Sequence, residues 1–186
     1  MTSERSDVQR DTSRFEAVVL PHLDAAFNLA RWLTRADEEA QEVVQEAFVR
    51  ALRFFDGYRG GDAKSWLLAI VRNTCYDRMR RERPGELTTE FDEEVHGVDP
   101  QMPGPEAALL IAEDARVVSQ ALEEIPVEFR EVLVLREIEG LSYKEIAGIT
   151  GLPIGTVMSR LARARRRMQQ RLVGQQWLAG RKKMED

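Results

Sequence analysis

The sequence is poor in the side chains that build metal centres and disulfides. Its 186 residues include one cysteine, Cys75, and two histidines, His22 and His96. One thiol cannot form an intrachain disulfide, and so few cysteines and histidines offer too small a ligand set for a zinc site. We therefore expect no cofactor, and the scarcity of cysteine fits a protein of a reducing compartment.

Long apolar runs are also missing. The sequence has no run of about 18 apolar residues, so no membrane insertion is expected. The first residues are polar and lack the apolar segment of a secretory signal, which predicts a cytoplasmic location. At roughly 100–200 residues per domain, the length allows one ordinary domain or two small ones.

Charge is distributed unevenly along the chain. The formal net charge is −5, which by itself argues against binding to nucleic acid. However, residues 85–106 carry seven acidic side chains and no lysine or arginine. Residues 153–172 carry six arginines and no acidic side chain. The average charge therefore hides one acidic segment and one basic segment.

Residues 12–83 have the apolar spacing of three helices. Pro21 interrupts the first helix and should kink or split it. The second helix starts in an acidic cluster, with Asp37 as the expected N-cap, and its apolar stripe includes Leu52. A loop with three glycines precedes the third helix, which Asp62 can cap.

A change of composition separates this first domain from a second. Residues 84–105 contain four of the seven prolines and three glycines, so we expect an acidic flexible linker there. Helical periodicity resumes in residues 106–174, and no alternating strand pattern of useful length occurs. The sequence predicts an all-α protein with two small helical domains, the second of which has four helices.

The clearest motif lies in this second domain. Ser142 and Glu145 have the spacing of a capping box, which opens a short helix. Gly151 can form a tight turn, and Pro153 occupies a position where the first turn of a helix tolerates proline. A short helix, a glycine turn and a long helix are the layout of a helix-turn-helix.

The long helix that follows has an apolar face and a cationic face. At ~100° per residue, its apolar side chains fall within ~80° of one another. Hydroxyls and arginines gather on another side, where arginine can bridge guanine O6 and N7. The alternative is a basic, solvated helix. That side carries Thr156, Ser159, Arg163 and Arg166, and the flanking arginines that suit phosphate contacts are Arg160, Arg165 and Arg167.

The third helix of the first domain has a second basic face, and the helix before it has an acidic start. Arginines beside an amide and an aromatic ring suit single-stranded nucleic acid, and a solvated charged face is the alternative. We expect Trp66 to lie in the core. The acidic start of the second helix either compensates the helix dipole or docks a basic partner. The basic face carries Arg72, Asn73, Tyr76, Arg80 and Arg83.

Three segments in this order resemble bacterial sigma factors of the extracytoplasmic-function (ECF) group. Residues 42–53 resemble the helix that binds core RNA polymerase, and residues 58–60 with 66–74 resemble the segment that melts and reads the −10 promoter element. Residues 140–147 and 155–165 resemble the helix-turn-helix that binds the −35 element. The resemblance implies that residues 12–83 form sigma region two and residues 106–174 form sigma region four.

The resemblance also implies partners and residue roles. The partners would be bacterial core RNA polymerase, promoter DNA and an anti-sigma factor, and the protein would not be an enzyme. Glu42, Gln45 and Glu46 would bind the polymerase. Asn73 would capture a flipped −10 base, while Arg72, Arg78, Arg80 and Arg81 would hold the opened strand. The −35 set is Thr156, Ser159, Arg160, Arg163 and Arg166.

Three other functions compete with this interpretation. The chain could be a stand-alone helix-turn-helix regulator, which would bind duplex DNA tightly without polymerase. It could be a small metal-dependent hydrolase that uses His22 and Asp24. It could also be a decoy that only sequesters an anti-sigma factor, although a decoy would not need the basic −10 face. Met158 departs from the arginine that many relatives of the ECF group carry there, which affects the expected −35 preference.

Overall fold

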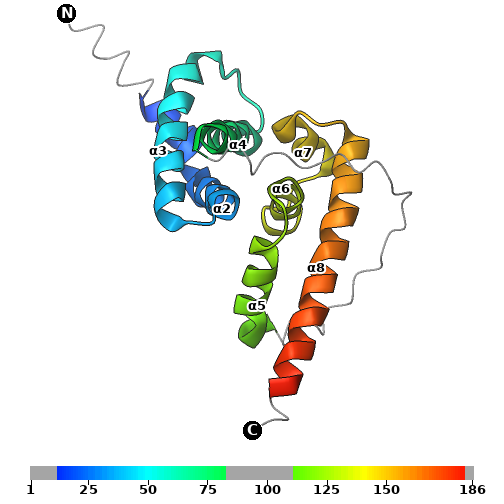
Figure 1. The fold of residues 1–186 in the computed structure, drawn as a ribbon. Helices are drawn as coiled ribbons and strands as arrows, with labels where there is room; N and C mark the ends of the chain where they lie inside the picture. Colours follow the sequence, from blue (N-terminus) through cyan, green and yellow to red (C-terminus); the bar gives the residue numbers. More distant parts are fainter. Residues whose placement is uncertain (1–11, 83–110, 183–186) are drawn as a thin grey trace, which may run out of the picture. The chain divides into compact units, whose positions relative to one another are not determined.

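The structure is a computed structural model that describes residues 12–82 and 111–182, with side chains described in 12–82 and 116–172. The predicted linker, residues 84–105, and Arg83 lie outside these ranges. All regular elements in the described ranges are helical (Figure 1), so the prediction of an all-α fold is confirmed. The described helices fall into two compact units.

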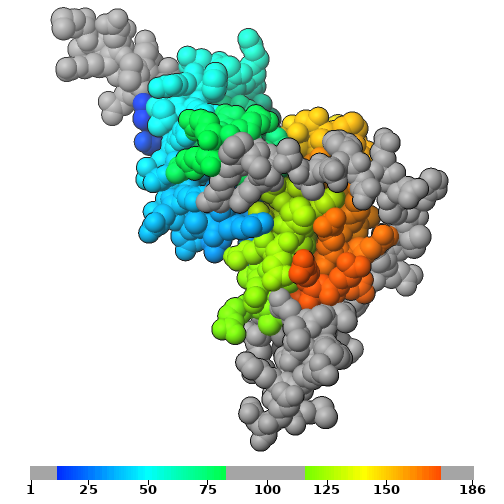
Figure 2. All heavy atoms as spheres, in the orientation of Figure 1, coloured from blue at the N-terminus to red at the C-terminus, as the bar shows by residue number. Residues whose placement is uncertain are grey.

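The first unit contains the three helices that the sequence predicts. Residues 12–19 are helical, and the helix then gives way to a 3₁₀ turn at Pro21, because the proline ring removes a backbone donor. In the space-filling view of Figure 2, the atoms of these helices adjoin one another on the face that is seen. In chain order the elements are η1 (Leu20–His22), α2 (Leu23–Thr34), α3 (Asp37–Phe54), η2 (Phe55–Gly57) and α4 (Ala63–Glu82).

One face of each helix builds the core of this unit. Leu29 of α2, Val43 of α3 and Leu68 of α4 are fully buried. Burial of such a side chain contributes about 1.5–3 kcal/mol. An aromatic cluster closes one end, where Phe55 and Trp66 have ring centroids 6.3 Å apart. Trp66 is half-buried, and it therefore lies at the edge of the core that we expected it to occupy.

Two expectations about α3 are wrong. Its N-cap is Ala36, and Asp37 is instead the first helical residue, where its charge still favours the helix dipole. Leu52 is 52% exposed, because it lies ~100° around the helix from buried Ala51 and beyond the buried stripe. The cap of α4 is confirmed, since the backbone N–H of Ser65 donates to Oδ1 of Asp62 at 3.2 Å.

The second described range contains four α-helices, as predicted: α5 (Ile111–Glu123), α6 (Val127–Leu133), α7 (Tyr143–Thr150) and α8 (Ile154–Lys182). α6 continues directly into a π-helical turn, η4 (Val134–Ile138). There the N–H of Glu139 bonds to the carbonyl of Val134 at 3.0 Å, five residues back. Residues 144–152, which hold α7, group with the first unit.

The second unit packs α5 and α6 against α8. Val157, Leu161 and Ala164 of the predicted apolar face of α8 are buried. Arg130 of α6 is also buried, at 1% exposure, and it donates to the carbonyls of Glu123 at 2.7 Å and Ile125 at 3.3 Å. The Glu123 carbonyl is the last of α5 and the Ile125 carbonyl lies in the connection to α6, so the guanidinium supplies a donor where helical hydrogen bonding ends.

Candidate nucleic-acid interface

The sequence order of a helix-turn-helix is present. α7 begins at Tyr143, directly after Ser142, as the capping box predicts. Gly151 then adopts a left-handed conformation with φ of 71°, which costs glycine little. Its N–H bonds to the carbonyl of Ala147 at 2.9 Å, so the turn ends α7 before α8 starts. α8 itself presents the predicted −35 residues.

Three arginines of α8 are available for a partner. Arg160 and Arg163 are partly exposed and Arg166 is exposed, and none of them forms an ion pair or hydrogen bond within the described ranges. Thr156 and Ser159 lie on the same face, and the Ser159 hydroxyl donates to the Thr156 carbonyl at 3.0 Å. The structure therefore brings the five predicted −35 residues onto one solvent-facing side of a single helix.

Two other arginines of α8, Arg165 and Arg167, contact the protein instead. Arg165 donates to the Glu137 carboxylate through Nε at 3.1 Å and Nη2 at 2.8 Å, and this hydrogen bond raises the pKa of Arg165. Arg167 lies 4.8 Å from the ring centroid of Phe129. The sequence predicts that Arg165 and Arg167 contact phosphates. In the structure, the Arg165 guanidinium faces η4 and the Arg167 guanidinium faces α6.

The exposed face of α4 combines an amide with cations. The Arg72 guanidinium lies 4.4 Å from the Tyr76 ring centroid, and it also donates to Oδ1 of Asn73 at 3.4 Å. Asn73 is exposed, and the side chains of Arg80 and Arg81 are 68% and 64% exposed. The predicted −10 residues other than Arg78 therefore face solvent to a large extent.

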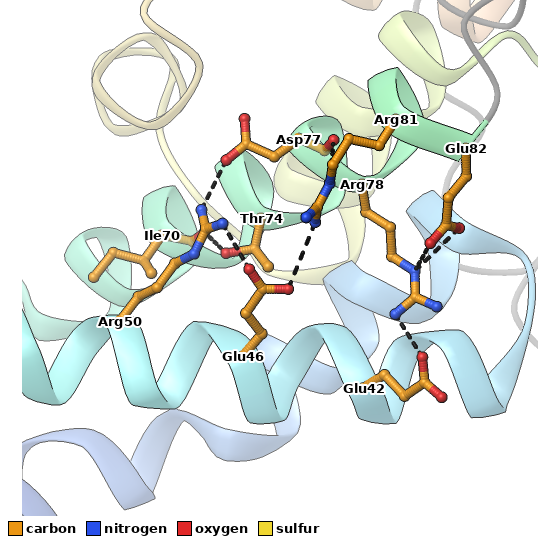
Figure 3. A network of polar contacts seen from close by, with 9 residues as sticks. All are labelled: Glu42, Glu46, Arg50, Ile70, Thr74, Asp77, Arg78, Arg81 and Glu82. Carbon is orange, nitrogen blue, oxygen red and sulfur yellow. Dashed lines mark hydrogen bonds and ion pairs between the residues drawn. The ribbon is translucent and has the colours of Figure 1, made fainter.

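Arg78 points toward α3, as Figure 3 shows. Its guanidinium pairs with Glu42 at 2.6 Å and Glu82 at 3.0 Å, and its side chain is only 21% exposed. The hydrogen bond to Glu42 is the main reason that the pKa of Arg78 is raised. Arg78 lies ~140° around α4 from Asn73, so the two residues belong to different faces.

The predicted polymerase-binding residues of α3 differ in their surroundings. Glu42 pairs with Arg78, and Glu46 pairs with Arg50 at 2.6 Å, whereas Gln45 is exposed. On the same side as Gln45, Val49 and Leu52 are each 52% exposed. Sequence reasoning missed these two residues, although their spacing of four and seven from Gln45 is the signal of a shared helix face.

Neither groups of metal ligands nor long apolar helices occur in the described ranges. No group of three histidine, cysteine, aspartate or glutamate side chains described there could hold a metal ion, so His22 and Asp24 have no companion ligands. Nor is any helix of the described ranges both long and apolar enough to cross a membrane.

Comparison with known families agrees with this geometry. Residues 18–84 match the family described as Sigma-70 region 2, and residues 115–168 match the family described as Sigma-70, region 4. The chain therefore belongs to the sigma-70 family and is an RNA polymerase sigma factor. Its relatives place it in the ECF group within that family.

Two of these relatives show how much of the chain is shared. The chain is 37% identical over 167 residues to the RNA polymerase sigma-H factor of Pseudomonas aeruginosa, covering 85% of this chain and 86% of that one. It is 34% identical over 163 residues to the ECF RNA polymerase sigma-E factor of Escherichia coli, covering 83% and 84%. The alternative of a stand-alone regulator is not favoured.

Solved structures confirm the fold. The sigma factor RpoE of Bartonella quintana, solved with the anti-sigma factor NepR, has a TM-score of 0.66 at 29% identity, covering 86% of this chain and 96% of that one. CnrH, solved with the cytosolic domain of CnrY, has a TM-score of 0.60 at 26% identity, covering 88% and 90%.

Proposed function

We propose that this sigma factor holds the opened −10 strand on α4 and the −35 duplex on α8 while α3 binds core polymerase. The observation that carries the proposal is the division of the arginines into two sets. Arg160, Arg163 and Arg166 have no protein partner in the described ranges, whereas Arg165 and Arg78 are held by carboxylates. Unpaired cations on one face are what a polyanion requires.

On α4, recognition of an unpaired base falls to Asn73. Its amide has two donors and one acceptor, which suit the edge of a base that has left the stack. Arg72 lies between this amide and the Tyr76 ring, and it can fix the amide while the ring offers a stacking surface. Because this face holds unpaired bases more tightly than paired ones, it favours the opened promoter without any catalytic residue.

The phosphates of the opened strand fall to Arg80 and Arg81, whose guanidinium groups are largely in solvent. Arg78 is different, because two carboxylates hold it between α3 and α4. We assign Arg78 a structural role in place of the strand contact that the sequence predicts. Its replacement should therefore lower the free energy of unfolding of the first unit. The salt dependence of DNA binding should change little.

On α8, Ser159 and Arg163 are the residues proposed to read base edges in the major groove. Hydroxyls and guanidinium groups have the geometry for that contact. Arg160 and Arg166 lie beside them and suit phosphates, which set the register of the helix on the duplex. Thr156 starts this face at the end of the helix where backbone N–H groups also favour a phosphate.

On α3, the proposed polymerase contact centres on Gln45, Val49 and Leu52. Two half-exposed apolar side chains beside an amide are typical of a docking face. The carboxylates of Glu42 and Glu46 border this face and can add contacts to a basic partner. A stand-alone regulator gives no reason for these apolar residues to be exposed.

An anti-sigma protein is proposed to control the chain, because RpoE of Bartonella quintana was solved with an anti-sigma factor. The test is to capture proteins on the full chain from extracts of the source organism and to add each captured protein to a transcription reaction. Inhibition that depends on this chain supports the proposal. Captured proteins that leave transcription unchanged contradict it.

Run-off transcription tests the main proposal. Bacterial core polymerase would transcribe fragmented genomic DNA of the source organism with and without this chain. We expect discrete start sites that depend on the chain, and the sequences upstream of them give both promoter elements. Tight duplex binding by the chain alone, with no new start sites, would replace the proposal with the stand-alone regulator.

A further inference from the structure

A carboxylate interrupts the basic face of α4. Asp77 lies four residues after Asn73 and three before Arg80, so it shares a side of the helix with both. Its Oδ1 is 3.7 Å from Nη1 of Arg80, and its side chain is 43% exposed. An uncompensated negative charge at this place would repel the phosphates of an incoming strand and would draw Arg80 toward itself.

Arg50 of α3 compensates that charge. Its Nη1 donates to Oδ2 of Asp77 at 2.8 Å, and its Nη2 donates to Oε1 of Glu46 at 2.6 Å (Figure 3). The guanidinium therefore bridges a carboxylate of its own helix and one of α4. The hydrogen bond from Arg50 to Asp77 is the main reason that the pKa of Arg50 is raised, so the bridge keeps its charge.

The same two carboxylates are also approached by arginines of the proposed strand face. Arg80 is 3.7 Å from Asp77, and Arg81 is 3.9 Å from Glu46. Charge-assisted hydrogen bonds under 3 Å are strong, whereas loose pairs between exposed side chains contribute little. Arg50 thus makes the short contacts, and the strand-facing arginines make only the long ones.

We propose that Arg50 is a positioning residue for −10 recognition, which satisfies Asp77 and Glu46 and so leaves Arg80 and Arg81 available to DNA phosphates. Arg50 does not touch the strand itself. Without it, each carboxylate would take the nearest guanidinium, and the basic face would lose two cations. The inference rests on the proposed role of α4 in holding the opened strand.

The test uses holoenzyme assembled from core polymerase and the full chain, and a fluorescent fork-junction DNA with the −10 sequence of a mapped, chain-dependent promoter. The variants are Arg50→Met, Asp77→Asn and the double variant. Arg53→Met is the matched control, because Arg53 is exposed on the same helix and has no ion pair within the described ranges. The readout is affinity as a function of salt concentration.

Loss of two phosphate contacts to a single strand lowers the slope of log K against log salt by ~1.4, which corresponds to up to ~25-fold weaker binding at ~0.1 M salt. We expect that effect for Arg50→Met and an unchanged slope for Arg53→Met. Asp77→Asn should bind at least as tightly as the unaltered chain. Added to Arg50→Met, it should restore ~0.7 of the lost slope by releasing Arg80.

A purely structural role for Arg50 makes the opposite forecast. Asp77→Asn would then weaken binding because it breaks the same bridge, and the double variant would be no better than Arg50→Met. Asp77→Asn decides the matter even if Arg50→Met does not fold. Failure of the proposed function is seen separately, since the unaltered chain would then direct no new start sites.

Discussion

Replacement of Arg163 or Arg165 by alanine separates the two sets of arginines on α8. The residues stand two positions apart and carry the same charge, so a helix that binds DNA through general basicity would respond equally to both changes. The structure predicts different responses. Arg163 has no ion pair within the described ranges, whereas Arg165 makes two hydrogen bonds to Glu137.

The magnitudes follow from these contacts. A guanidinium that reads a guanine contributes ~1–3 kcal/mol, which is about 5- to 150-fold in affinity. Loss of a phosphate contact on duplex DNA lowers the salt slope by ~0.9. The Arg165–Glu137 pair is partly exposed, at 23% and 37%, so its loss should cost the second unit only ~0.2–1 kcal/mol of stability.

The assay is binding of each holoenzyme to a duplex that carries the −35 element of a mapped promoter, measured over a range of salt concentrations. We expect Arg163→Ala to weaken binding and Arg165→Ala to leave affinity and slope close to those of the unaltered protein. In urea unfolding of the free chain, Arg165→Ala should lower the free energy of unfolding more than Arg163→Ala does. An equal loss of DNA affinity in both variants would refute the division.

Three further predictions follow from single contacts. Asp62→Ala should destabilise the first unit by ~1 kcal/mol in urea unfolding, and Asp62→Asn by less, because asparagine can also cap α4. The hydrogen bond from Ser65 lowers the pKa of Asp62 in the folded protein below its ordinary value of 3.8. The stabilisation by this carboxylate is therefore complete above pH 3.8, and it is lost as the pH falls through the pKa of the folded state. Val49→Asp and Leu52→Asp should weaken polymerase binding by ~10-fold or more in a titration. Their melting temperatures should stay near that of the unaltered chain, because both side chains are half-exposed. Lower melting temperatures would assign the two residues to the core. Met158→Arg should steepen the salt slope of duplex binding by ~0.9 if this exposed position reaches a phosphate, and an unchanged slope would place it away from the DNA.

Most of the fold could be predicted because helical periodicity and local punctuation agree. Pro21, the glycine loop before Asp62 and the turn at Gly151 each mark an element boundary through backbone chemistry that does not depend on the rest of the chain. The misses arise where tertiary packing decides. Leu52 is apolar like its buried neighbours, and only its place beyond the stripe, on the side of Gln45 and Val49, separates it from them. The π-helical turn of η4 has a hydrogen bond that spans five residues, and the apolar spacing does not reveal it.

The site was less predictable than the fold, for a related reason. A helical wheel shows on which face of a helix a residue lies, but it does not show which groups the end of a long side chain contacts. Arg78 and Arg165 both reach carboxylates on other elements, Glu42 and Glu137, that lie 36 and 28 positions away in the sequence. Because arginine side chains are long, those contacts follow from tertiary structure, and periodicity cannot anticipate them.

The engaged arginines also explain how a chain with a net negative charge can present basic faces. A cation that is paired inside the protein adds little to the field that a distant phosphate experiences, because its carboxylate cancels it. In the proposed function, DNA meets the arginines of α8 that are unpaired in the described ranges and the loosely paired arginines at the end of α4, and their positions matter more than the total. Asp77 and Glu137 each hold one guanidinium group at 2.8 Å, those of Arg50 and Arg165, so the number of arginines in the sequence overstates the positive charge that these faces offer to a partner.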